Sequence, residues 1–333
     1  MTNGIYIYGV IKLSNSQEPQ NFGIDNPAIP RVFTVGFQDI AAVVSPRPLM
    51  RYDSLEQEQV VQDLAIHNFV IEKAMERFTI VPIKFGSMVE AEAEVTEFLT
   101  KGYTLLHEIL KRMEGHRELD VVARWELSKV LPIISRENSQ IREKQQEIAA
   151  KAGNASMEDK IILGQYIERA LTAEKTRYHQ AILQALQPVA EEVGVHDIAG
   201  DEMIFNAAFL LATPAVDAFY HALDALDQSL ESSVNFRVVG PLPPYSFATI
   251  EVKRFDRASI DEAREILHLP VDITAKTVRD AYHQLAKEHH PDTNSEEDSR
   301  EFQRINTAYT TLQDFTENGL IYPQVYQWPN ERE

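Results

Sequence analysis

Short apolar runs alternate with amphipathic stretches in the first part of the chain. Strands are predicted for the runs rich in β-branched or alternating apolar residues: Ile5–Ile11, Arg31–Val35, Ile40–Ser45, Ile80–Phe85 and Leu119–Leu127. Apolar residues at helical spacing predict one helix that ends near Phe78 and another over Glu90–Met113. Pro46 and Pro48 are expected to stop the third strand, since proline cannot donate to a β-ladder. This alternation predicts an N-terminal α+β domain over residues 1–134.

Glycine and proline are scarce from Ser135 to Val195, which favours long helices. We expect one helix over Arg136–Ala152 and a longer one over Met157–Val193, together forming a helical segment of residues 135–198. The longer helix carries an apolar stripe, which fits either of two interpretations. In the favoured interpretation the stripe belongs to the core. In the other, part of the stripe cradles a helix of a partner protein.

The next stretch has the order strand, helix, strand, turn, strand. Its strands are predicted at Met203–Ala212, Val234–Val239 and Tyr245–Lys253, and its helix at Pro214–Leu230. This order indicates a ferredoxin-like α+β domain over residues 199–256, an antiparallel sheet with helices on one face.

Only helices are predicted from Asp261 onward. A short helix over Asp261–His268 precedes two facing amphipathic helices, Ala275–His289 and Glu297–Phe315, which together form an αα-hairpin. We assign these helices to residues 257–318 and expect an irregular tail over residues 319–333. The whole chain is thus predicted to be an α+β protein with a C-terminal helical hairpin.

Composition and charge narrow the classes of function. The 333 residues are 44% apolar and 25% charged, as in soluble globular proteins of two or three domains. The absence of cysteine excludes disulfides and thiolate metal sites. A net charge of −19 argues against nucleic acid or a lipid membrane as a partner. No secretory signal is recognisable, and the most apolar stretch, Met203–Val216, is shorter than the roughly 20 residues that span a bilayer. A cytoplasmic protein is expected.

Candidate chemistry is sparse. The chain has no Walker A, Gly-x-Gly-x-x-Gly, Gly-x-Ser-x-Gly or His-Glu-x-x-His motif. Gly240–Pro244 contains three prolines, which lack the N–H donors of a phosphate loop, so a rigid turn is favoured. His289 and His290 have no further ligands at metal-site spacing. Lys84 is either a site residue or, as we favour, the solvent side of a strand. We expect no enzyme activity, cofactor or metal.

Two short motifs flank the helical middle of the chain and resemble a known family. They consist of Ile5-Tyr6-Ile7-Tyr8-Gly9, His67, Val81-Pro82-Ile83-Lys84-Phe85-Gly86 and Gly240-Pro241-Leu242-Pro243-Pro244-Tyr245-Ser246-Phe247. In this order they resemble the GvpF/GvpL family of gas vesicle proteins, over roughly residues 4–255. The family-motif residues that we single out are Pro82, Phe85, Gly86, Gly240, Pro241, Pro244, Tyr245 and Phe247. Lys84 and Leu242 depart from the pattern, which has arginine and often an aromatic residue there.

The C-terminal helices carry a second resemblance. Ala263–Pro270, Ala281-Tyr282, His290-Pro291-Asp292 and Phe302–Leu312 are similar to the J-domain of DnaJ-type co-chaperones. J-domains present a basic second helix and the His-Pro-Asp loop to a DnaK-type ATPase. In this chain the corresponding helix, Ala275–His289, has three cations against two anions.

The first resemblance implies an accessory protein of gas vesicle assembly, in the cytoplasm and as a minor component of the gas vesicle. It would bind the apolar GvpA-type shell protein, and other accessory proteins of the vesicle, and limit aggregation of the shell protein during nucleation. The net charge of −19 would keep such a complex dispersed. The alternative implied by His290, Pro291 and Asp292 is a J-domain co-chaperone that recruits a DnaK-type ATPase to vesicle proteins.

Overall fold

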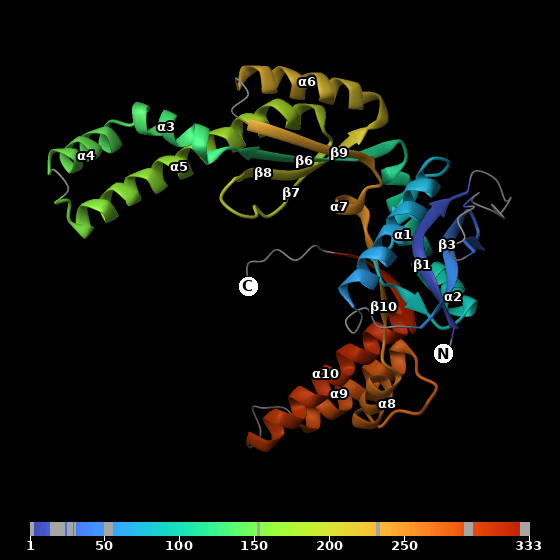
Figure 1. The fold of residues 1–333 in the computed structure, drawn as a ribbon. Helices are drawn as coiled ribbons and strands as arrows, with labels where there is room; N and C mark the ends of the chain where they lie inside the picture. The colour runs from blue at the N-terminus through green and yellow to red at the C-terminus, as the bar shows by residue number, and fades with distance from the viewer. Residues whose placement is uncertain are drawn as a thin grey trace. The chain divides into compact units, whose positions relative to one another are not determined.

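A computed structural model of the chain describes residues 3–13, 24, 29, 31–49, 56–151, 154–230, 234–289 and 296–326. The chain divides into two compact units (Figure 1). The first unit consists of Met1–Glu114 together with Ala248–Glu333, and the second unit is Gly115–Phe247. In the described residues the first unit has two sheets and the second unit has one, each unit has its own apolar core, and each is described below by itself.

The first unit is built on an antiparallel sheet in the order β2-β3-β1-β4, in which a short strand β5 also pairs with β1. The strands are β1 (Asn3–Lys12), β2 (Phe33–Phe37), β3 (Ile40–Pro48), β4 (Ile80–Pro82) and β5 (Met88–Val89). Tyr6, Ile7 and Tyr8 are all fully buried, so both faces of β1 are covered. The predicted strands in this region are therefore present, with bounds that differ by a few residues.

Pro46 and Pro48 do not stop the third strand, contrary to the sequence prediction. They pair with Ile5 and Asn3 of β1 inside β3. The partner on the other side of β3, β2, pairs only with residues 40–44. The last part of β3 is therefore an edge, where a missing N–H donor breaks no ladder.

Helices α1 (Gln57–Met75) and α2 (Glu92–Met113) complete the N-terminal part of this unit. The apolar face of α2, including Val95, Phe98 and Leu106, is fully buried, as its helical spacing predicts.

The predicted strand Tyr245–Lys253 and the predicted irregular tail are both corrected. Residues 245–248 form a single helical turn, α7 (Tyr245–Ala248), and the strand after it, β10 (Ile250–Arg254), lies in the first unit. It pairs with β11 (Ile321–Val325), which falls inside the predicted tail. Pro323 hides this strand from sequence analysis but is tolerated because β11 is an edge.

Three helices lie between β10 and β11. They are α8 (Arg257–Ile266), α9 (Ala275–Glu288) and α10 (Glu296–Asn318). Their shared core contains Val278 and Leu285 of α9 and Ile305 and Leu312 of α10, which the predicted apolar faces include. Thr274 caps α9. The helical hairpin predicted from the sequence is confirmed in the described residues.

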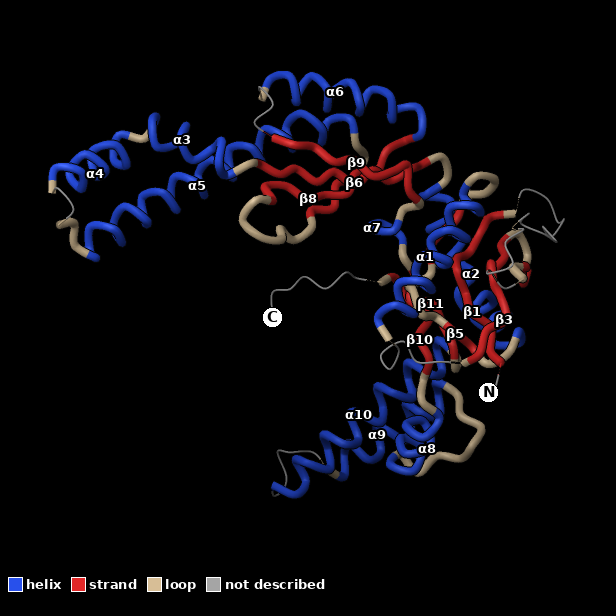
Figure 2. The backbone as a smooth tube through the Cα atoms, viewed as in Figure 1, coloured by secondary structure: helices blue, strands red, loops and turns tan. Residues whose placement is uncertain are grey.

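The second unit is a complete βαββαβ ferredoxin-like fold (Figure 2). Its antiparallel sheet has the order β7-β8-β6-β9. In chain order the elements are β6 (His116–Trp125), α3 (Leu127–Glu137), α4 (Ser139–Ala150), α5 (Met157–Leu186), β7 (Glu192–Val195), β8 (Met203–Ala212), α6 (Val216–Ser229) and β9 (Val234–Leu242).

The predicted domain boundaries after residues 134, 198 and 256 do not separate these units. The strand predicted at Leu119–Leu127 is β6, a central strand of the ferredoxin-like sheet, and the helices of the predicted segment 135–198 form the first crossover of that fold. The helix predicted over Met157–Val193 ends at Leu186, and residues 192–195 form the sheet strand β7 instead. The predicted helix Arg136–Ala152 is divided between α3 and α4, since Asn138 ends one helix and its side chain caps the next. The predicted boundaries fail because β6 pairs with β8 and β9, which lie far along the chain and therefore belong to the same unit as β6.

Candidate functional sites

The first family motif comes together around a buried histidine in the first unit. The His67 ring on α1 lies against Tyr6, Tyr8 and Phe85, with ring centroids 5.7, 5.9 and 5.6 Å away. The Gly86 N–H donates to the Tyr6 hydroxyl at 3.0 Å, and that hydroxyl is 2.9 Å from His67 Nδ1. Segments that are far apart in the sequence thus join in one hydrogen-bonded chain.

Electrostatics keep His67 neutral. Burial and, secondarily, the charge of the Arg47 guanidinium lower the pKa of His67 from 6.5 to about 4. A neutral imidazole has one acceptor nitrogen, so His67 Nδ1 accepts the Tyr6 O–H while the ring bonds the Ile83 backbone. Gly86 has φ 85°, a left-handed conformation that favours glycine, which accounts for this residue at the end of the motif.

A buried ion pair lies beside this histidine. Arg47 Nη1 donates to Asp63 Oδ1 at 2.9 Å, and the two side chains are only 6% and 7% exposed. The Arg47 guanidinium also lies over the Tyr6 ring, 5.1 Å from its centroid, and the Tyr8 hydroxyl is 2.8 Å from Ser45 Oγ. Arg47 and Asp63 carry no motif signal, and sequence analysis missed them. The cluster joins α1 to the sheet, and no nucleophile and base in it face a cavity.

The structure gives the remaining first-motif residues structural roles. Pro82 pairs with Gly9 across β4 and β1. Lys84 forms an ion pair with Glu251 of β10 at 2.9 Å, and its ammonium lies 4.3 Å from the centre of the Tyr326 ring. Lys84 lies two residues beyond the end of β4 and its ammonium is paired with Glu251, so the favoured interpretation of Lys84 as the solvent side of a strand is wrong.

The second family motif begins as the irregular end of β9 beside β6 and continues into a turn at Pro243 and Pro244. Gly240 has φ 141° and precedes a cis peptide bond to Pro241. A Cβ on Gly240 would lie 2.8 Å from the Glu118 carbonyl oxygen, so only glycine fits there. After the turn, the Tyr245 N–H donates to the Pro243 carbonyl, and Pro244 accepts from the Phe247 N–H. Residues 240–242 belong to β9, so the turn predicted over Gly240–Pro244 is confined to Pro243 and Pro244.

This turn presents Ser246 to a buried carboxyl group. Glu118 is 1% exposed, and it accepts the Ser246 N–H and Oγ–H, each at 2.8 Å. Ser246 Oγ also lies 3.3 Å from His196 Nε2. Burial and the neighbouring Asp120 raise the pKa of Glu118 to about 8. Polar residues alternating with Leu119 and Val121 along β6 were the available signal for Glu118 and Asp120.

The long helix α5 is only partly covered. Of its residues, only Asp159, Tyr178, Ile182 and Leu186 are buried, while Leu163, Ile167 and Leu171 are partly buried against the core. A groove of about 460 Å³ follows one side of the helix. Its lining is apolar at Trp125, Leu127, Gly164, Ile167 and Leu171 and polar at Glu168, Thr172, Lys175 and Asp201. A second groove, of about 280 Å³, includes Val130, Ile133, Ala170 and Tyr178. The stripe is thus core in the last part of the helix and accessible earlier.

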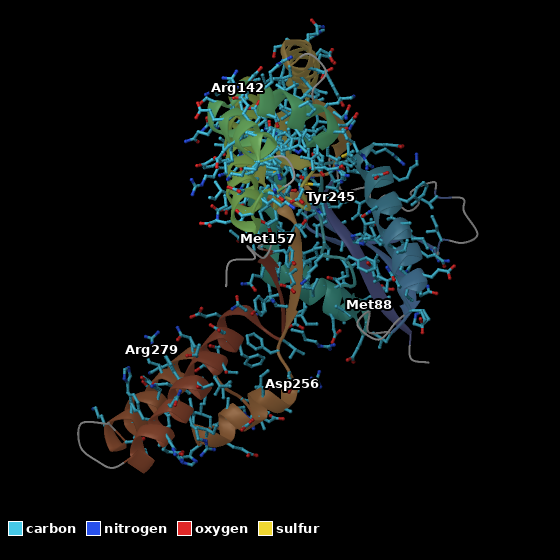
Figure 3. The ribbon with its side chains drawn as sticks, turned by 60° about the vertical axis from the view of Figure 1, so that its left-hand side comes forward. Met88, Arg142, Met157, Tyr245, Asp256 and Arg279 are labelled. Carbon is cyan, nitrogen blue, oxygen red and sulfur yellow. The ribbon has the colours of Figure 1, made fainter. Side chains whose placement is uncertain are left out.

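The J-like loop residues His290, Pro291 and Asp292 lie outside the described residues. The helices on both sides are in place: the Tyr282 and Tyr309 rings stack 4.2 Å apart, and the Tyr282 hydroxyl donates to Asn306 Oδ1 at 2.8 Å. Lys276 and Arg279 are exposed on α9 and form no ion pair with another described residue (Arg279 is labelled in Figure 3). The basic surface expected of a J-domain is therefore small but accessible.

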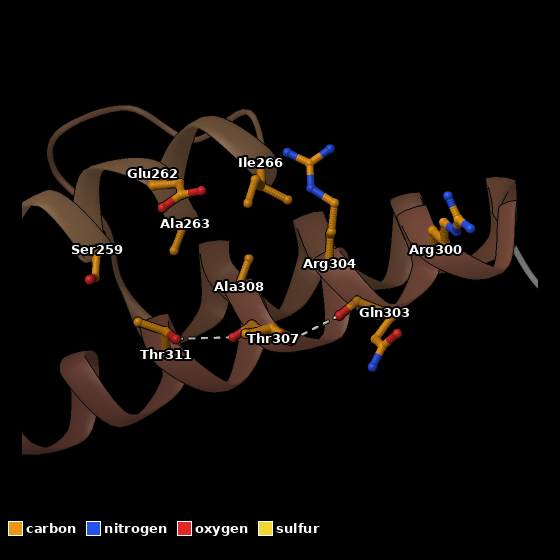
Figure 4. A pocket seen from close by; sticks show the side chains of 10 residues that line it. All are labelled: Ser259, Glu262, Ala263, Ile266, Arg300, Gln303, Arg304, Thr307, Ala308 and Thr311. Atoms are coloured by element: carbon orange, nitrogen blue, oxygen red, sulfur yellow. Dashed lines mark hydrogen bonds between the residues drawn. The ribbon is translucent and has the colours of Figure 1, made fainter. Parts of the chain in front are cut away.

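The same hairpin has a hollow on another side. A cavity of about 530 Å³ lies between α8 and α10, with Glu262 and Ile266 on one helix and Arg300 and Arg304 on the other (Figure 4). Thr307 and Thr311 at its floor donate to carbonyl groups of their own helix. Their hydroxyl protons are therefore engaged within α10.

Among the described residues, no three histidine or acidic side chains are grouped so that they could hold a metal ion. Within the same residues, none of the helices combines the length and apolarity that crossing a bilayer requires.

Comparison with known proteins defines the class, that of gas vesicle proteins. The family described as gas vesicle synthesis protein GvpL/GvpF matches residues 4–249, and the DnaJ domain matches residues 264–318. The chain belongs to the GvpL/GvpF family, as its two motifs indicated, and it is an accessory protein of gas vesicles. Its C-terminal helices are a DnaJ-domain match, as the second resemblance indicated.

The relatives each cover about three quarters of this chain. Gas vesicle protein F of Nostoc sp. is 27% identical over 256 residues, which is 75% of this chain and 100% of that protein. Gas vesicle protein F of Haloferax mediterranei is 23% identical over 76% of this chain and 96% of its own length. The crystal structure of GvpF from Anabaena sp. matches with a TM-score of 0.63 at 26% identity, over 74% of this chain and 98% of that one. The GvpF structure from Microcystis aeruginosa gives a TM-score of 0.57.

Proposed function

We propose that this protein holds the apolar GvpA-type shell protein of gas vesicles and limits its aggregation while vesicles nucleate. It then stays as a minor component of the vesicle, having worked in the cytoplasm. The mechanism is reversible burial of apolar surface, and no covalent bond is made or broken. The single observation that carries this proposal is the groove beside α5, where Ile167 and Leu171 are only partly buried.

The groove suits an apolar helix for two physical reasons. An amphipathic partner helix buries its apolar face in such a groove, and removal of that surface from water drives association. Gly164 opens the groove, since a Cβ at this position would meet no atom within 4 Å. The net charge of −19 repels other complexes of the same kind and keeps a loaded protein dispersed.

Gly164 also provides a matched pair of variants. Gly164→Trp fills the groove with a large side chain, whereas Gly164→Ala adds one methyl group in open space. The alanine variant is expected to stabilise α5 by about 0.5–1 kcal/mol, since glycine is unfavourable inside a helix. Any loss of function in the tryptophan variant is then not a consequence of a weakened helix.

The test is light scattering of shell protein diluted from denaturant. The unaltered chain and Gly164→Ala are expected to delay scattering at near-stoichiometric ratio, and Gly164→Trp is expected to lose most of that delay. Equal delay by all three would place the holding surface elsewhere. No delay by the unaltered chain over a broad range of concentration would contradict the holding mechanism itself.

A second candidate function is recruitment of a DnaK-type ATPase. The observation that favours it is the exposed pair Lys276 and Arg279 on α9 of the DnaJ-domain match, since clustered cations steer an acidic partner. A steady-state ATPase assay with a DnaK-type chaperone compares three proteins. They are the full chain, the variant His290→Gln, and the double variant that carries Lys276→Gln together with Arg279→Gln. Stimulation that both variants lose supports the function, and no stimulation by the unaltered chain contradicts it.

A further inference from the structure

Two short strands lie at the ends of the three J-like helices α8, α9 and α10. Only Phe255 and Asp256 separate β10 from α8, and only Gly319 and Leu320 separate α10 from β11. The two strands pair antiparallel along their whole length (Figure 2). This pair of strands, the clasp, therefore holds the two ends of the helical segment together. It lies outside both family matches, which cover residues 4–249 and 264–318.

The clasp shares the apolar core of the helices that it joins. Phe255 and Leu320, one in each connection, both pack against the core of α8, α9 and α10. The Phe255 ring lies against Phe315 of α10 and Tyr322 of β11, with ring centroids 6.1 and 5.3 Å away. The Phe255 N–H donates to the Leu320 carbonyl at 3.1 Å, which extends the pairing into the two connections. The helices are thus joined to the clasp by packed segments.

On its other side the clasp is fitted to α2. Ile321 and Pro323 of β11 are buried. Pro323 occupies a slot that Gly102 leaves on α2, since a Cβ on Gly102 would lie 2.1 Å from Pro323 Cγ. At the start of β11, the Leu320 N–H donates to Glu97 Oε1 of α2 at 3.1 Å. Shape and hydrogen bonding therefore both fix β11 on this helix.

The strand β10 is held at both of its ends. The Lys84 N–H donates to the Ile250 carbonyl at 2.8 Å. At the other end, the Arg254 guanidinium donates to Glu90 at 3.1 Å and also pairs with Glu94 of α2. These contacts attach β10 to the rest of the first unit independently of β11.

Of the two strands, β11 is the more weakly held. In the described residues it pairs only with β10, and Pro323 has no N–H to donate to the ladder. Its last two residues, Gln324 and Val325, are exposed. Short edge elements with exposed residues open at a lower free energy than core strands. The J-like helices have a core cluster of their own, so β11 can leave α2 without unfolding them.

We propose that the clasp fixes the J-like helices in one orientation relative to the rest of the first unit, and that β11 is the strand that releases them. While β11 is docked on α2, both ends of the helical segment are held. When β11 leaves α2, the segment stays attached only through Phe255 and Asp256 and rotates independently. A DnaK-type ATPase bound at α9 then acts from one fixed place while the clasp is closed. That consequence rests on the second candidate function, whereas the orientation itself does not.

The experiment is time-resolved fluorescence anisotropy on the full-length chain. The chain has no cysteine, so Arg279→Cys places one probe on α9 and Glu108→Cys places one on α2, both at exposed positions (Arg279 is labelled in Figure 3). Both probes are expected to report the same rotational correlation time while the clasp is closed. After release, the α9 probe is expected to rotate about 2-fold or more faster, since the J-like helices are a small part of the 333-residue chain.

Two variants open the clasp in different ways. A chain that ends at Asn318 lacks β11, and its control, a chain that ends at Tyr326, keeps the whole clasp. Gly102→Leu fills the slot that Pro323 occupies, and its control is Thr104→Leu, at an exposed position of the same helix. Both controls are expected to behave as the unaltered chain does, and the α2 probe is expected to be unchanged throughout. Circular dichroism checks the helices, and Gly102→Leu decides the question if the shortened chain loses helix.

Two results would overturn the proposal. One is faster rotation of the α9 probe than of the α2 probe in the chain with an unaltered clasp, because the helices would then move freely although β11 is present. The other is equal and slow rotation of both probes in the folded variants that open the clasp, because β11 would then not be what holds the helices. Neither shell protein nor an ATPase takes part in this assay, so failure of this inference and failure of either proposed function are distinguishable.

Discussion

Removal of the acidic partner from the buried ion pair Arg47–Asp63 should destabilise the sheet of the first unit strongly. The change Asp63→Ala leaves the Arg47 guanidinium in a place where its side chain is only 6% exposed. The Tyr6 ring, 5.1 Å away, offers a cation–π contact but no counter-charge.

The expected loss is about 3–5 kcal/mol, which is typical when one partner of a buried ion pair is removed. The matched control is Glu76→Ala, which breaks the pair with Lys73, where the two side chains are 41% and 60% exposed. That pair is solvated, so its loss should change stability by about 1 kcal/mol or less. The double variant Arg47→Met, Asp63→Leu should recover most of the lost stability, because it removes both charges and fills the space with apolar side chains.

Hydrogen exchange of the β1 and β3 amides is the suitable assay, because it reports the opening of this sheet separately from the second unit. The protection of these amides should fall by at least about 100-fold in Asp63→Ala, as a loss of about 3 kcal/mol implies. A loss no larger than that of Glu76→Ala would refute the view that burial makes this ion pair important.

Three further predictions concern single side chains. The pKa of His67 is lower in the folded chain (about 4) than its ordinary value of 6.5, so its stabilising contribution is present above pH 6.5 and is lost as the pH falls toward 4. His67→Asn should remove about 3 kcal/mol of this pH dependence in urea unfolding, and an unchanged slope would contradict the buried neutral histidine. The pKa of Glu118 is raised from 4.5 to about 8, so stability should fall as the pH rises through this window. Glu118→Gln should abolish that fall when unfolding is followed by Trp125 fluorescence in a Trp328→Phe background, and an unchanged fall would contradict the buried carboxyl. A Cβ on Gly102 would lie 2.1 Å from Pro323 Cγ, so Gly102→Ala should destabilise the docking of β11 by about 1–3 kcal/mol and increase exchange of its amides, and intact protection would contradict that contact.

Local pattern was sufficient for most of the individual elements. The apolar spacing of α2, α5, α9 and α10 identified helices, and apolar runs identified the longer strands of the two larger sheets. The short strands β5 and β7 and the tail strand β11 were not predicted. Pairing partners were harder, because they depend on contacts between distant segments. The ferredoxin-like fold needs β6 beside β8, as in the pair Val121–Ala207, and no local signal specifies that pairing.

The candidate sites show the same division. The family motifs identified the neighbourhoods of His67 and of Ser246, but not their buried partners. Asp63 and Glu118 occur in sequence contexts that are ordinary for exposed residues, and only the folded chain brings them to Arg47 and Ser246. Pro323 caused an error of another kind. Proline disfavours strands, so none was predicted there, but the structure accommodates Pro323 in the edge strand β11.

The most direct test of the central claim is site-specific crosslinking to the shell protein. The chain has no cysteine, so Gly164→Cys provides one attachment point for a photo-crosslinker inside the groove beside α5, and Arg142→Cys provides one on the exposed surface of α4. The account predicts a crosslink to freshly diluted shell protein from position 164 and little or none from position 142. Equal crosslinking from both positions, or none from position 164, would contradict it.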